Sequence, residues 1–289
     1  MTKVAITGPS GFVARNLISY LKSKGEYDIV ELSLRNDDWK KNDFSDIDAI
    51  VHLAGISSAK KDVSFDIYKS INVDLTRILA QKAKEHNIFF IFVSSMGVMF
   101  DRNPSLRKNY ILDLKTECNP TSNYSKSKYE AELLLRNMAD EKFKVAVVRP
   151  PIIYGEGCSG NYNLLRKIVL KLPFFPDFKN RKSMIYVGNL CELFRLIIDS
   201  RADGLFLPQN RELVETKDLV AKIAKCNGKK IYFSKLMATA VKIFAPFVAK
   251  IAKAFGNLYY TEKDSNAFDG AYQIYDFNTS VELTEKQRF

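Results

Sequence analysis

The chain has 289 residues, of which 46% are hydrophobic and 27% are charged, and its formal net charge at neutral pH is +11. This length is enough for one sizeable hydrophobic core, or for one core with a smaller lobe. We find no run of eighteen apolar residues without charges and no apolar leader at the start, so neither a transmembrane helix nor a signal peptide is predicted.

The cysteines and the positive charge narrow the class of protein further. Cys118, Cys158, Cys191 and Cys226 lie far apart, form no Cys-x-x-Cys pair, and are accompanied by only two histidines. This pattern predicts neither a disulfide framework nor a metal site, and it fits the reducing cytoplasm best. The charge suits nucleic acid, an anionic membrane surface or an anionic small molecule such as a nucleotide. Nucleic acid is the least favoured, because the lysines are spread along the chain without a nucleic-acid-binding signature.

The first 25 residues predict a strand, a glycine turn and a helix. The apolar run Lys3–Thr7 is followed by Gly8 and Gly11, in the spacing Gly-x-x-Gly-x-x-Ala, and the helical pattern ends at Gly25. Gly8 would permit a tight turn. Gly11 would let the backbone approach a pyrophosphate at the helix N-terminus, where free N–H groups favour anions. An ordinary strand–helix turn is the alternative, but the place of this turn at the start of alternating strands and helices favours a dinucleotide.

The second predicted strand, Asp28–Ser33, bears on the choice of cofactor. Dinucleotide folds that prefer NAD place an acidic residue near the end of this strand, to hold the ribose 2′-OH. Here that position is Ser33, and Arg35 follows two residues later. A neutral residue followed by arginine suits the 2′-phosphate of NADP. A surface arginine without such a role is the alternative, so the pattern favours NADP over NAD without excluding NAD.

Two further strands end in residues suited to a ligand. Asp48–Gly55 is a buried strand with small residues at its end, and Ile88–Val93 is a buried strand that leads into Ser94 and Ser95. In a doubly wound sheet, ligands bind at the carboxyl ends of the strands. We therefore expect the end of the first strand to lie beside the glycine turn, where a flat cofactor passes, and the two hydroxyls to lie near a ligand. His52, within the first strand, is predicted to be a packed residue.

A polar segment and a long helix lie between these strands. Asn36–Asp46 is short and polar, and it predicts a truncated strand or a loop. Asp66–His86 predicts one long amphipathic helix. Its apolar side would carry Ile67, Ile71, Leu75, Ile78, Leu79 and Ala83.

A third helix is predicted over Thr121–Ala139 and carries Tyr124 and Lys128. Their spacing of four residues puts both side chains on one face, about one turn apart. A phenol has a pKa of about 10, and a neighbouring ammonium would lower it. The pair could then exchange a proton with a carbinol oxygen. For an isolated Tyr-x-x-x-Lys sequence, a solvated helix face is the alternative.

The last strand of this half is Lys144–Val148, and adjacent prolines at Pro150 and Pro151 shape a rigid turn after it. The pattern then loosens into what we interpret as a smaller lobe. We therefore predict an α/β fold with a doubly wound parallel Rossmann sheet in residues 1–160 and a substrate-binding α/β lobe in residues 161–289. Segments within 183–207 are candidates to return to the sheet. The elements expected here are helices over Asn161–Lys171, Asn189–Asp199 and Thr216–Cys226, and strands over Ser183–Val187, Gly204–Leu207 and Lys230–Phe233.

The segment Leu236–Phe255 is apolar but carries Lys242, Lys250 and Lys253 on one helical face. A basic amphipathic helix can make peripheral contact with a membrane surface. The alternative, which we favour at this point, is a helix packed on the lobe with its lysines facing water. Pro246 interrupts the segment and counts against a single straight helix.

Five motifs together resemble a known family. Their order and approximate spacing are similar to those of the extended short-chain dehydrogenase/reductases, the NAD-dependent epimerase/dehydratase enzymes of nucleotide sugars. The resemblance covers about residues 1 to 260. The motifs are Thr7–Phe12, His52–Gly55, Ser94-Ser95-x-x-Val98, Tyr124-x-x-x-Lys128 and Arg149–Gly155.

The resemblance implies a role for each matching residue. Tyr124 would be the catalytic acid/base, Lys128 would hold the nicotinamide ribose and lower the tyrosine pKa, and Ser95 would bind the sugar C4 oxygen. The implied cofactor-binding residues are Gly8, Ser10, Gly11, Phe12, Val13, Arg35, Leu53, Ala54, Gly55, Ser94, Tyr124, Lys128, Pro150 and Pro151. The implied substrate-binding residues are Ser95, Met96, Asn163, Arg181 and Lys182, the last three near positions that hold the substrate diphosphate.

One departure from the family narrows the chemistry. Members that are 4,6-dehydratases have Asp and Glu directly after the active hydroxyl, whereas this chain has Met96 and Gly97 there. Two reactions on a UDP-sugar remain: reduction of a 4-keto-6-deoxy-hexosamine by NADPH, and 4-epimerization with NAD. Similarity to capsule- and O-antigen-locus members, and the missing acidic ribose residue, favour the reductase in surface polysaccharide biosynthesis.

Two further expectations follow from the resemblance. Some proteins with this fold use the dinucleotide turn for sensing or scaffolding without catalysis, but these lack the Ser/Tyr/Lys set, so an enzyme is expected. Family members often form homodimers through two long helices. In this chain those helices would be Asp66–His86 and Thr121–Ala139.

Overall fold

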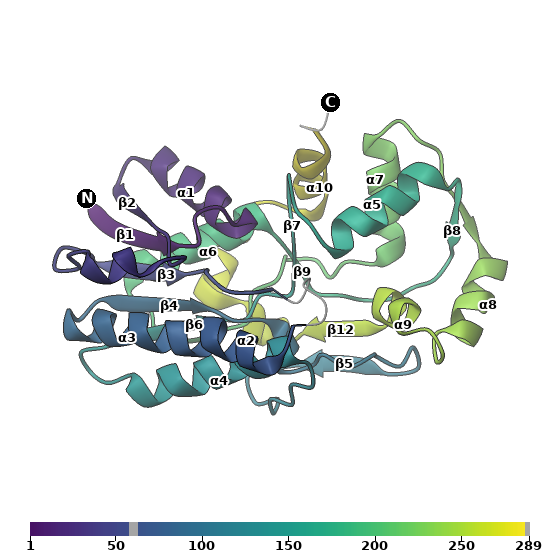
Figure 1. Cartoon of the computed structure of the whole chain (residues 1–289). Helices are drawn as coiled ribbons and strands as arrows, with labels where there is room; N and C mark the ends of the chain where they lie inside the picture. The colour runs from purple at the N-terminus through teal and green to yellow at the C-terminus, as the bar shows by residue number, and fades with distance from the viewer. Residues whose placement is uncertain (58–62, 287–289) are drawn as a thin grey trace. The chain divides into compact units, whose positions relative to one another are not determined.

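The computed structural model describes residues 1–57 and 63–286, and the chain divides into two compact units whose segments alternate along the sequence (Figure 1). The sequence places one boundary at residue 160, with a possible return at 183–207; in the structure the chain passes between the units several times. Unit 1 comprises Met1–Asp101, Glu117–Pro150 and Leu190–Pro208, and unit 2 comprises Arg102–Thr116, Pro151–Asn189 and Gln209–Phe289.

Unit 1 contains a six-stranded parallel sheet with the strand order β10-β6-β4-β3-β1-β2. The chain first extends the sheet from β1 to β2 and then continues on the other side of β1 with β3. The order therefore reverses between β1 and β3, the point at which doubly wound sheets bind ligands. The predicted Rossmann fold is confirmed. The strands are β1 (Thr2–Thr7), β2 (Tyr27–Leu32), β3 (Ala49–His52), β4 (Phe89–Val93), β6 (Val145–Val148) and β10 (Gly204–Phe206).

Helices cover both faces of this sheet. Ala83 of α3 and Leu135 of α4 belong to a buried cluster with Phe90 and Phe92 of β4. On the other face, the Tyr20 hydroxyl of α1 donates a hydrogen bond to Glu192 of α6. The helices are α1 (Phe12–Lys24), α2 (Phe65–Tyr68), α3 (Leu75–Glu85), α4 (Asn123–Met138) and α6 (Val187–Ser200), whose first residues belong to unit 2.

The predicted helix Asp66–His86 is one helical path, but it contains a π-helical segment, Lys69–Asp74, between α2 and α3. A π segment inserts an extra residue per turn and rotates the residues around it. As a result the predicted apolar side is wrong in part: Ile67 and Ile78 are 49% and 40% exposed. The polar residues Asn72 and Thr76 are buried instead.

The polar segment Asn36–Asp46 forms a 3-10 helix, Asp37–Lys41, and no strand. Trp39 and Phe44 from this segment are buried in the same cluster as α3 and α4. The segment therefore contributes to the core through two aromatic side chains, and β2 remains the edge of the sheet.

Unit 2 is built from helices and three two-stranded parallel sheets. The helices predicted over 161–171 and 216–226 are confirmed to the residue, and the 236–255 segment breaks at Pro246 as expected. Five of the helices and strands, β5, β7, β8, β12 and α10, were not predicted. The helices are α5 (Asn161–Lys171), α7 (Thr216–Cys226), α8 (Lys235–Phe244), α9 (Ala249–Phe255) and α10 (Phe277–Lys286). The strand pairs are β5 (Asn109–Leu112) with β12 (Asn257–Tyr260), β7 (Ile152–Tyr154) with β9 (Met184–Tyr186), and β8 (Phe174–Pro176) with β11 (Tyr232–Ser234). Among the described residues, none of the helices is long and apolar enough to cross a membrane.

A buried ion pair ties α4 to the sheet of unit 1. The Arg149 guanidinium, just after β6, donates hydrogen bonds from Nε to both carboxylate oxygens of Glu132, at 3.0 and 3.2 Å. Both side chains are less than 5% exposed. Removing one partner of such a pair leaves the other charge buried and uncompensated, which is strongly destabilising.

We expect Glu132→Ala to lower the free energy of unfolding by about 3 to 5 kcal/mol, measured by chemical denaturation. Replacing both partners, as Glu132→Leu with Arg149→Met, should recover most of that loss, since no buried charge remains. The matched control is Asp140→Ala, which breaks an exposed pair with Lys84 and should have a far smaller effect. Equal losses in Glu132→Ala and Asp140→Ala would contradict the argument from burial.

Candidate functional site

The glycine turn lies at the end of β1, directly against the segment that follows β3. Gly8 has a left-handed φ of +65°, and a Cβ atom added to it would lie 3.1 Å from Ala54 Cα. Gly11 is the N-cap of α1 and contributes no side chain that would cover the first backbone N–H groups of the helix. These groups can therefore bind an anion, as predicted for a pyrophosphate. Phe12 and Val13 are the first two residues of α1.

Arg35 reaches this turn from beyond the end of β2. Its Nη2 atom donates a hydrogen bond to the Ser10 hydroxyl at 3.2 Å. The guanidinium is exposed and lies at the glycine turn, where the second strand of a dinucleotide fold presents its ribose-binding residue. The arginine is thus placed as the NADP prediction requires, although this position also allows NAD.

A chain of buried hydrogen bonds begins directly below the turn. The Thr7 hydroxyl oxygen accepts hydrogen bonds from the backbone N–H groups of Leu53 and Ala54, both at 2.9 Å. Its own proton is therefore directed to His52 Nδ1, also at 2.9 Å. With Nδ1 accepting, His52 Nε2 carries the proton and donates to the Thr76 hydroxyl at 2.9 Å. Thr76 in turn donates to the Asn72 carbonyl at 2.8 Å, so donors and acceptors match along the whole chain.

Burial fixes His52 in its neutral form. It lowers the pKa of His52 to about 3, and the charge of Lys128 adds to the shift. The prediction that His52 is a packed strand residue therefore agrees with its surroundings, and the structure adds that both ring nitrogens are used.

Asn72, in the π-helical segment, connects the loop after β3 to α4. Its Oδ1 accepts from the Ile56 backbone N–H at 2.8 Å, and its Nδ2 donates to the Ile56 carbonyl and to the Ser127 hydroxyl. A Cβ atom on Gly55 would lie only 2.8 Å from Asn72 Oδ1, so this approach requires glycine. Ser127 donates to the carbonyl of Tyr124 at 2.8 Å. Sequence reasoning missed Asn72; the available signal was a polar residue within an apolar helical pattern.

Ser95, Tyr124 and Lys128 all belong to unit 1. Tyr124 lies in the first turn of α4, and Ser95 follows the end of β4. Burial raises the pKa of Tyr124, and the Ser95 side chain offsets part of that rise. The phenol is therefore protonated at neutral pH and able to donate a proton.

Lys128 does not act on Tyr124 as the sequence predicted. Its ammonium donates a hydrogen bond to the Val93 carbonyl at 2.8 Å and lies 4.6 Å from the centre of the Phe92 ring. Burial lowers the pKa of Lys128 to about 8. The expected lowering of the Tyr124 pKa is wrong for this structure, because burial of the phenol dominates and the lysine charge is held at the end of β4.

The segment after β4 leaves room for a cofactor but not for a carboxylate. The Ser94 hydroxyl is buried and has no hydrogen-bond partner among the residues that the structure describes. An unpaired buried hydroxyl beside the sheet's carboxyl edge fits a site completed by a dinucleotide. A Cβ atom on Gly97 would lie 2.8 Å from the Ser125 hydroxyl. The Met96 backbone N–H donates to the Pro150 carbonyl at 3.0 Å, which joins the proline turn to this segment.

The remaining predicted residues, Pro151, Asn163, Arg181 and Lys182, belong to unit 2. Asn163 lies on α5. Arg181 donates its backbone N–H to Asn257 at 2.7 Å, and Lys182 donates from Nζ to the Lys253 carbonyl. Burial lowers the pKa of Lys182 to about 8. The roles of Asn163, Arg181 and Lys182 toward a diphosphate, and that of Pro151 toward the cofactor, stay predictions.

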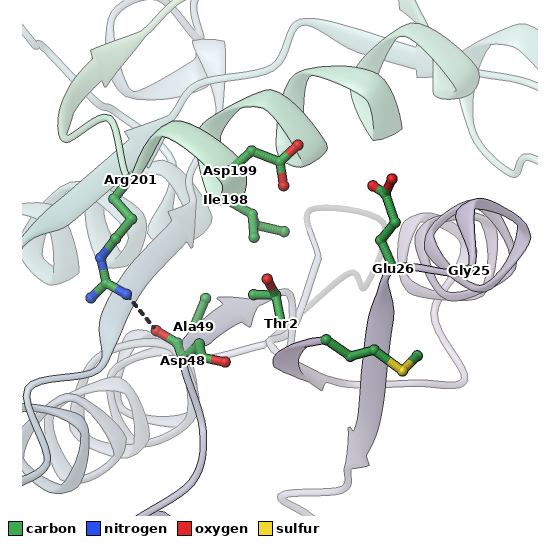
Figure 2. Close-up of a pocket in the computed structure, with 9 residues that line it drawn as sticks. Thr2, Gly25, Glu26, Asp48, Ala49, Ile198, Asp199 and Arg201 are labelled. Carbon is green, nitrogen blue, oxygen red and sulfur yellow. Dashed lines mark hydrogen bonds between the residues drawn. The ribbon is translucent and has the colours of Figure 1, made fainter.

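A cavity of about 660 Å³ lies at the other end of the sheet, where β1 and β3 begin (Figure 2). Figure 2 shows Arg201 donating to the Asp48 carbonyl, with the carboxylates of Glu26 and Asp199 nearby. Ligands of doubly wound sheets bind at the opposite, carboxyl ends of the strands. The acidic lining is also unsuited to a phosphate, so this cavity is not the candidate site.

Comparisons with known proteins agree with this geometry. The profile of the NAD dependent epimerase/dehydratase family matches residues 4–205. UDP-glucose 4-epimerase from Vibrio cholerae is 29% identical over 276 residues, which cover 86% of this chain and 82% of the relative. N-acetyl-alpha-D-glucosaminyl-diphospho-ditrans,octacis-undecaprenol 4-epimerase from Escherichia coli O157:H7 is 29% identical, and the match covers 79% of this chain and 73% of the relative. UDP-2-acetamido-2,6-beta-L-arabino-hexul-4-ose reductase from Pseudomonas aeruginosa is 23% identical, and the match covers 69% of this chain and 50% of the relative. Among solved structures, UDP-N-acetylglucosamine 4-epimerase from Bacillus cereus has a TM-score of 0.77 at 16% identity and covers 99% of both chains.

The buried state of His52 predicts a pH dependence of stability. The unfolded histidine has a pKa of about 6.5, and the folded pKa is about 3. Protons therefore bind the unfolded chain preferentially between these values. The free energy of unfolding should fall as pH drops below 6.5, with a contribution of up to about 1.4 kcal/mol per pH unit from this residue.

Denaturant unfolding between pH 7 and pH 5 measures this slope. His52→Asn should show a shallower slope than the wild type, because it lacks the group that charges on unfolding. The exposed His86 provides the control, since His86→Asn should keep the wild-type slope. If His52→Asn and the wild type have the same slope, His52 is not held neutral by burial.

Proposed function

We propose that this chain, which belongs to the NAD dependent epimerase/dehydratase family, interconverts the C4 epimers of a UDP-hexose or a UDP-N-acetylhexosamine. The observation that carries the proposal is the placement of three side chains in unit 1: Ser95 after β4, which offsets part of the rise in the Tyr124 pKa, and Tyr124 and Lys128 one turn apart on α4. This set can hold one carbinol oxygen and move its proton. Two relatives that are 29% identical and match most of this chain are themselves 4-epimerases.

The residues of unit 1 would act on the C4 oxygen of the sugar. The bound dinucleotide supplies a hydride acceptor and donor at C4. Oxidation at C4 requires Tyr124 as the phenolate, the minor form at neutral pH because burial raises its pKa. In that form Tyr124 would take the hydroxyl proton as C4 becomes a ketone, and would return it when the hydride comes back on the other face of the sugar. Ser95 holds the same oxygen by a hydrogen bond, and Lys128 supplies a buried positive charge. The sugar is neither oxidised nor reduced overall.

The sequence disfavours a dehydratase, and so does the limited room for a side chain at position 97. Removing water across C5 and C6 needs carboxylates after the active hydroxyl. Met96 is buried, and a side chain at Gly97 would collide with the Ser125 hydroxyl. A carboxylate at position 97 would require the Ser125 side chain to move.

The sequence alone favours a 4-keto sugar reductase, and the comparisons support the epimerase at least as well. The reductase relative is 23% identical and matches half of its own length. One observation keeps the reductase as the second candidate: Arg35 contacts Ser10 of the glycine turn, where an NADP 2′-phosphate would lie. A reductase of this kind would use NADPH and release NADP at each turnover.

The two reactions differ in whether they consume the cofactor: epimerization leaves the nicotinamide unchanged overall, whereas reduction consumes one NADPH per product. We expect the purified protein with NAD to equilibrate UDP-glucose with UDP-galactose, or the two N-acetylated sugars, without net formation of NADH. Product analysis by NMR, together with nicotinamide absorbance, measures both quantities. Stoichiometric loss of NADPH with a UDP-4-keto-6-deoxy sugar, and no epimer from either UDP-sugar pair, would replace the epimerase with the reductase.

Tyr124→Phe should lower kcat by about a hundredfold to ten-thousandfold, because the proton carrier is lost while the ring remains. Substrate binding should change little. Tyr129→Phe is the matched control: it removes a phenol on the same helix, but its five-residue spacing puts it on the other side, and activity should be retained. Unchanged turnover in Tyr124→Phe would remove the basis of the enzymatic proposal in either form.

A further inference from the structure

The helix α8 of unit 2 has two apolar faces. Ala238, Val241 and Ala245 are buried against the rest of the unit. Leu236 and Ile243, seven residues apart and therefore on one face, lie on the opposite side and are 82% and 57% exposed. An ordinary surface helix buries one apolar stripe and turns polar residues outward. The outer face of α8 is apolar instead. An apolar outer face does not help a helix that faces only water.

The apolar surface continues into the turn that follows. Phe244, in the last turn of α8, is 53% exposed, and Phe247, after Pro246, is 84% exposed. In Figure 1 the helix lies at the outer edge of unit 2, beside β8. The strand pair there adds Phe174 and Tyr232, two exposed rings whose centres are 5.8 Å apart. We call the outer face of α8 with the turn to Val248 the α8 surface.

The stretch of sequence that contains α8 carries charge of one sign. In space, Asp177 lies beside the start of α8 and pairs with Lys217. The sequence from Leu219 to Thr261 contains eight lysines and no aspartate, glutamate or arginine, although the whole chain has 33 acidic residues. Lys242 and Lys250 are exposed and form no salt bridge with any residue that the structure describes. The lysines of this stretch are Lys222, Lys225, Lys229, Lys230, Lys235, Lys242, Lys250 and Lys253.

We propose that the α8 surface docks the protein on an anionic lipid bilayer. Leucine, isoleucine and phenylalanine side chains would enter the boundary between headgroups and acyl chains, and the flanking lysines would face the lipid phosphates. The combination distinguishes this occupant from others. An apolar face alone would suit a second protein chain, and lysines alone would suit any anion, whereas both together on one helix match an anionic membrane surface. The inference does not depend on the proposed reaction.

The structure adds to the interpretation made from the sequence. The helix α8 packs on unit 2 through its buried face, and Lys242 faces water, as that interpretation expects. Leu236, Ile243 and Phe247 are nevertheless among the most exposed large apolar side chains of the described chain. The break at Pro246 does not oppose docking, because it places Phe247 in an exposed turn between α8 and α9.

Vesicle flotation of the full chain tests the proposal. We expect binding to phosphatidylcholine vesicles that contain phosphatidylglycerol, weak or no binding to phosphatidylcholine alone, and loss of binding as salt increases. The double variant Leu236→Ser, Phe247→Ser should bind about tenfold or more weakly, since it removes the inserting side chains. The double variant Lys242→Gln, Lys250→Gln should bind the anionic vesicles more weakly, and its weak binding to phosphatidylcholine vesicles should not change.

The matched control is Ile111→Thr, which replaces an apolar residue of unit 2 that is 51% exposed on β5, away from α8. It should bind like the wild type. Thermal unfolding of each variant checks that the fold is kept. Activity on a dissolved UDP-sugar should be unchanged in all of them, which separates this proposal from the proposed function.

Three outcomes would overturn the proposal. The wild type could fail to bind either kind of vesicle at low salt. The Leu236→Ser, Phe247→Ser variant could bind as well as the wild type. Size-exclusion chromatography could give a wild-type dimer that this variant dissociates, in which case a second copy of the chain covers the α8 surface.

Discussion

The buried hydrogen-bond chain from Thr7 through His52 and Thr76 to Asn72 is the constraint on which the candidate site depends. It joins the end of β1, the end of β3 and the π-helical segment, and Asn72 extends it to α4 through Ser127. Each ring nitrogen of His52 makes one hydrogen bond, and each threonine hydroxyl both donates and accepts, so the direction of every bond is fixed. Removing one member would leave a buried polar group unpaired, at a cost of about 1 to 3 kcal/mol. The glycine turn and Tyr124 are thereby held in one rigid frame.

The sheet of unit 1 was predictable because parallel strands covered on both faces are continuous apolar runs. Every residue of β3 and of β4 is buried, which is the pattern the sequence displays at 49–52 and 89–93. The small sheets of unit 2 were not predictable by the same means. β5 spans four residues with mixed exposure, and its partner β12 begins 148 residues later, at Asn257 against Asn109. A register of that kind is set by tertiary contacts, which no local pattern reveals.

The candidate site was predictable where it depends on strand ends and helix spacing, and not where it depends on burial. Ser95, Tyr124 and Lys128 lie on the elements that the sequence indicates. Asn72 and Thr76 were missed because a constant period of 3.6 residues assigns their positions to the wrong side of the helix, and the π segment changes that period. The pKa of Tyr124 was wrong in direction for a similar reason, since spacing places Lys128 on the same face but does not say that its ammonium binds the Val93 carbonyl.

The groups that move the proton do not distinguish an epimerase from a reductase. Both reactions need one acid/base and one hydrogen bond at the C4 oxygen, and Tyr124 with Ser95 suits either. The difference is whether the dinucleotide stays bound after hydride transfer, and this depends on contacts with its other parts. Arg35 and Ser10 lie at the glycine turn, at the end of β1, whereas Ser95 follows β4, two strands away in the sheet. The exposed Arg35 would bind a 2′-phosphate in a salt-dependent way. We therefore expect the residues that decide the reaction to lie at the cofactor's ribose rather than at the sugar.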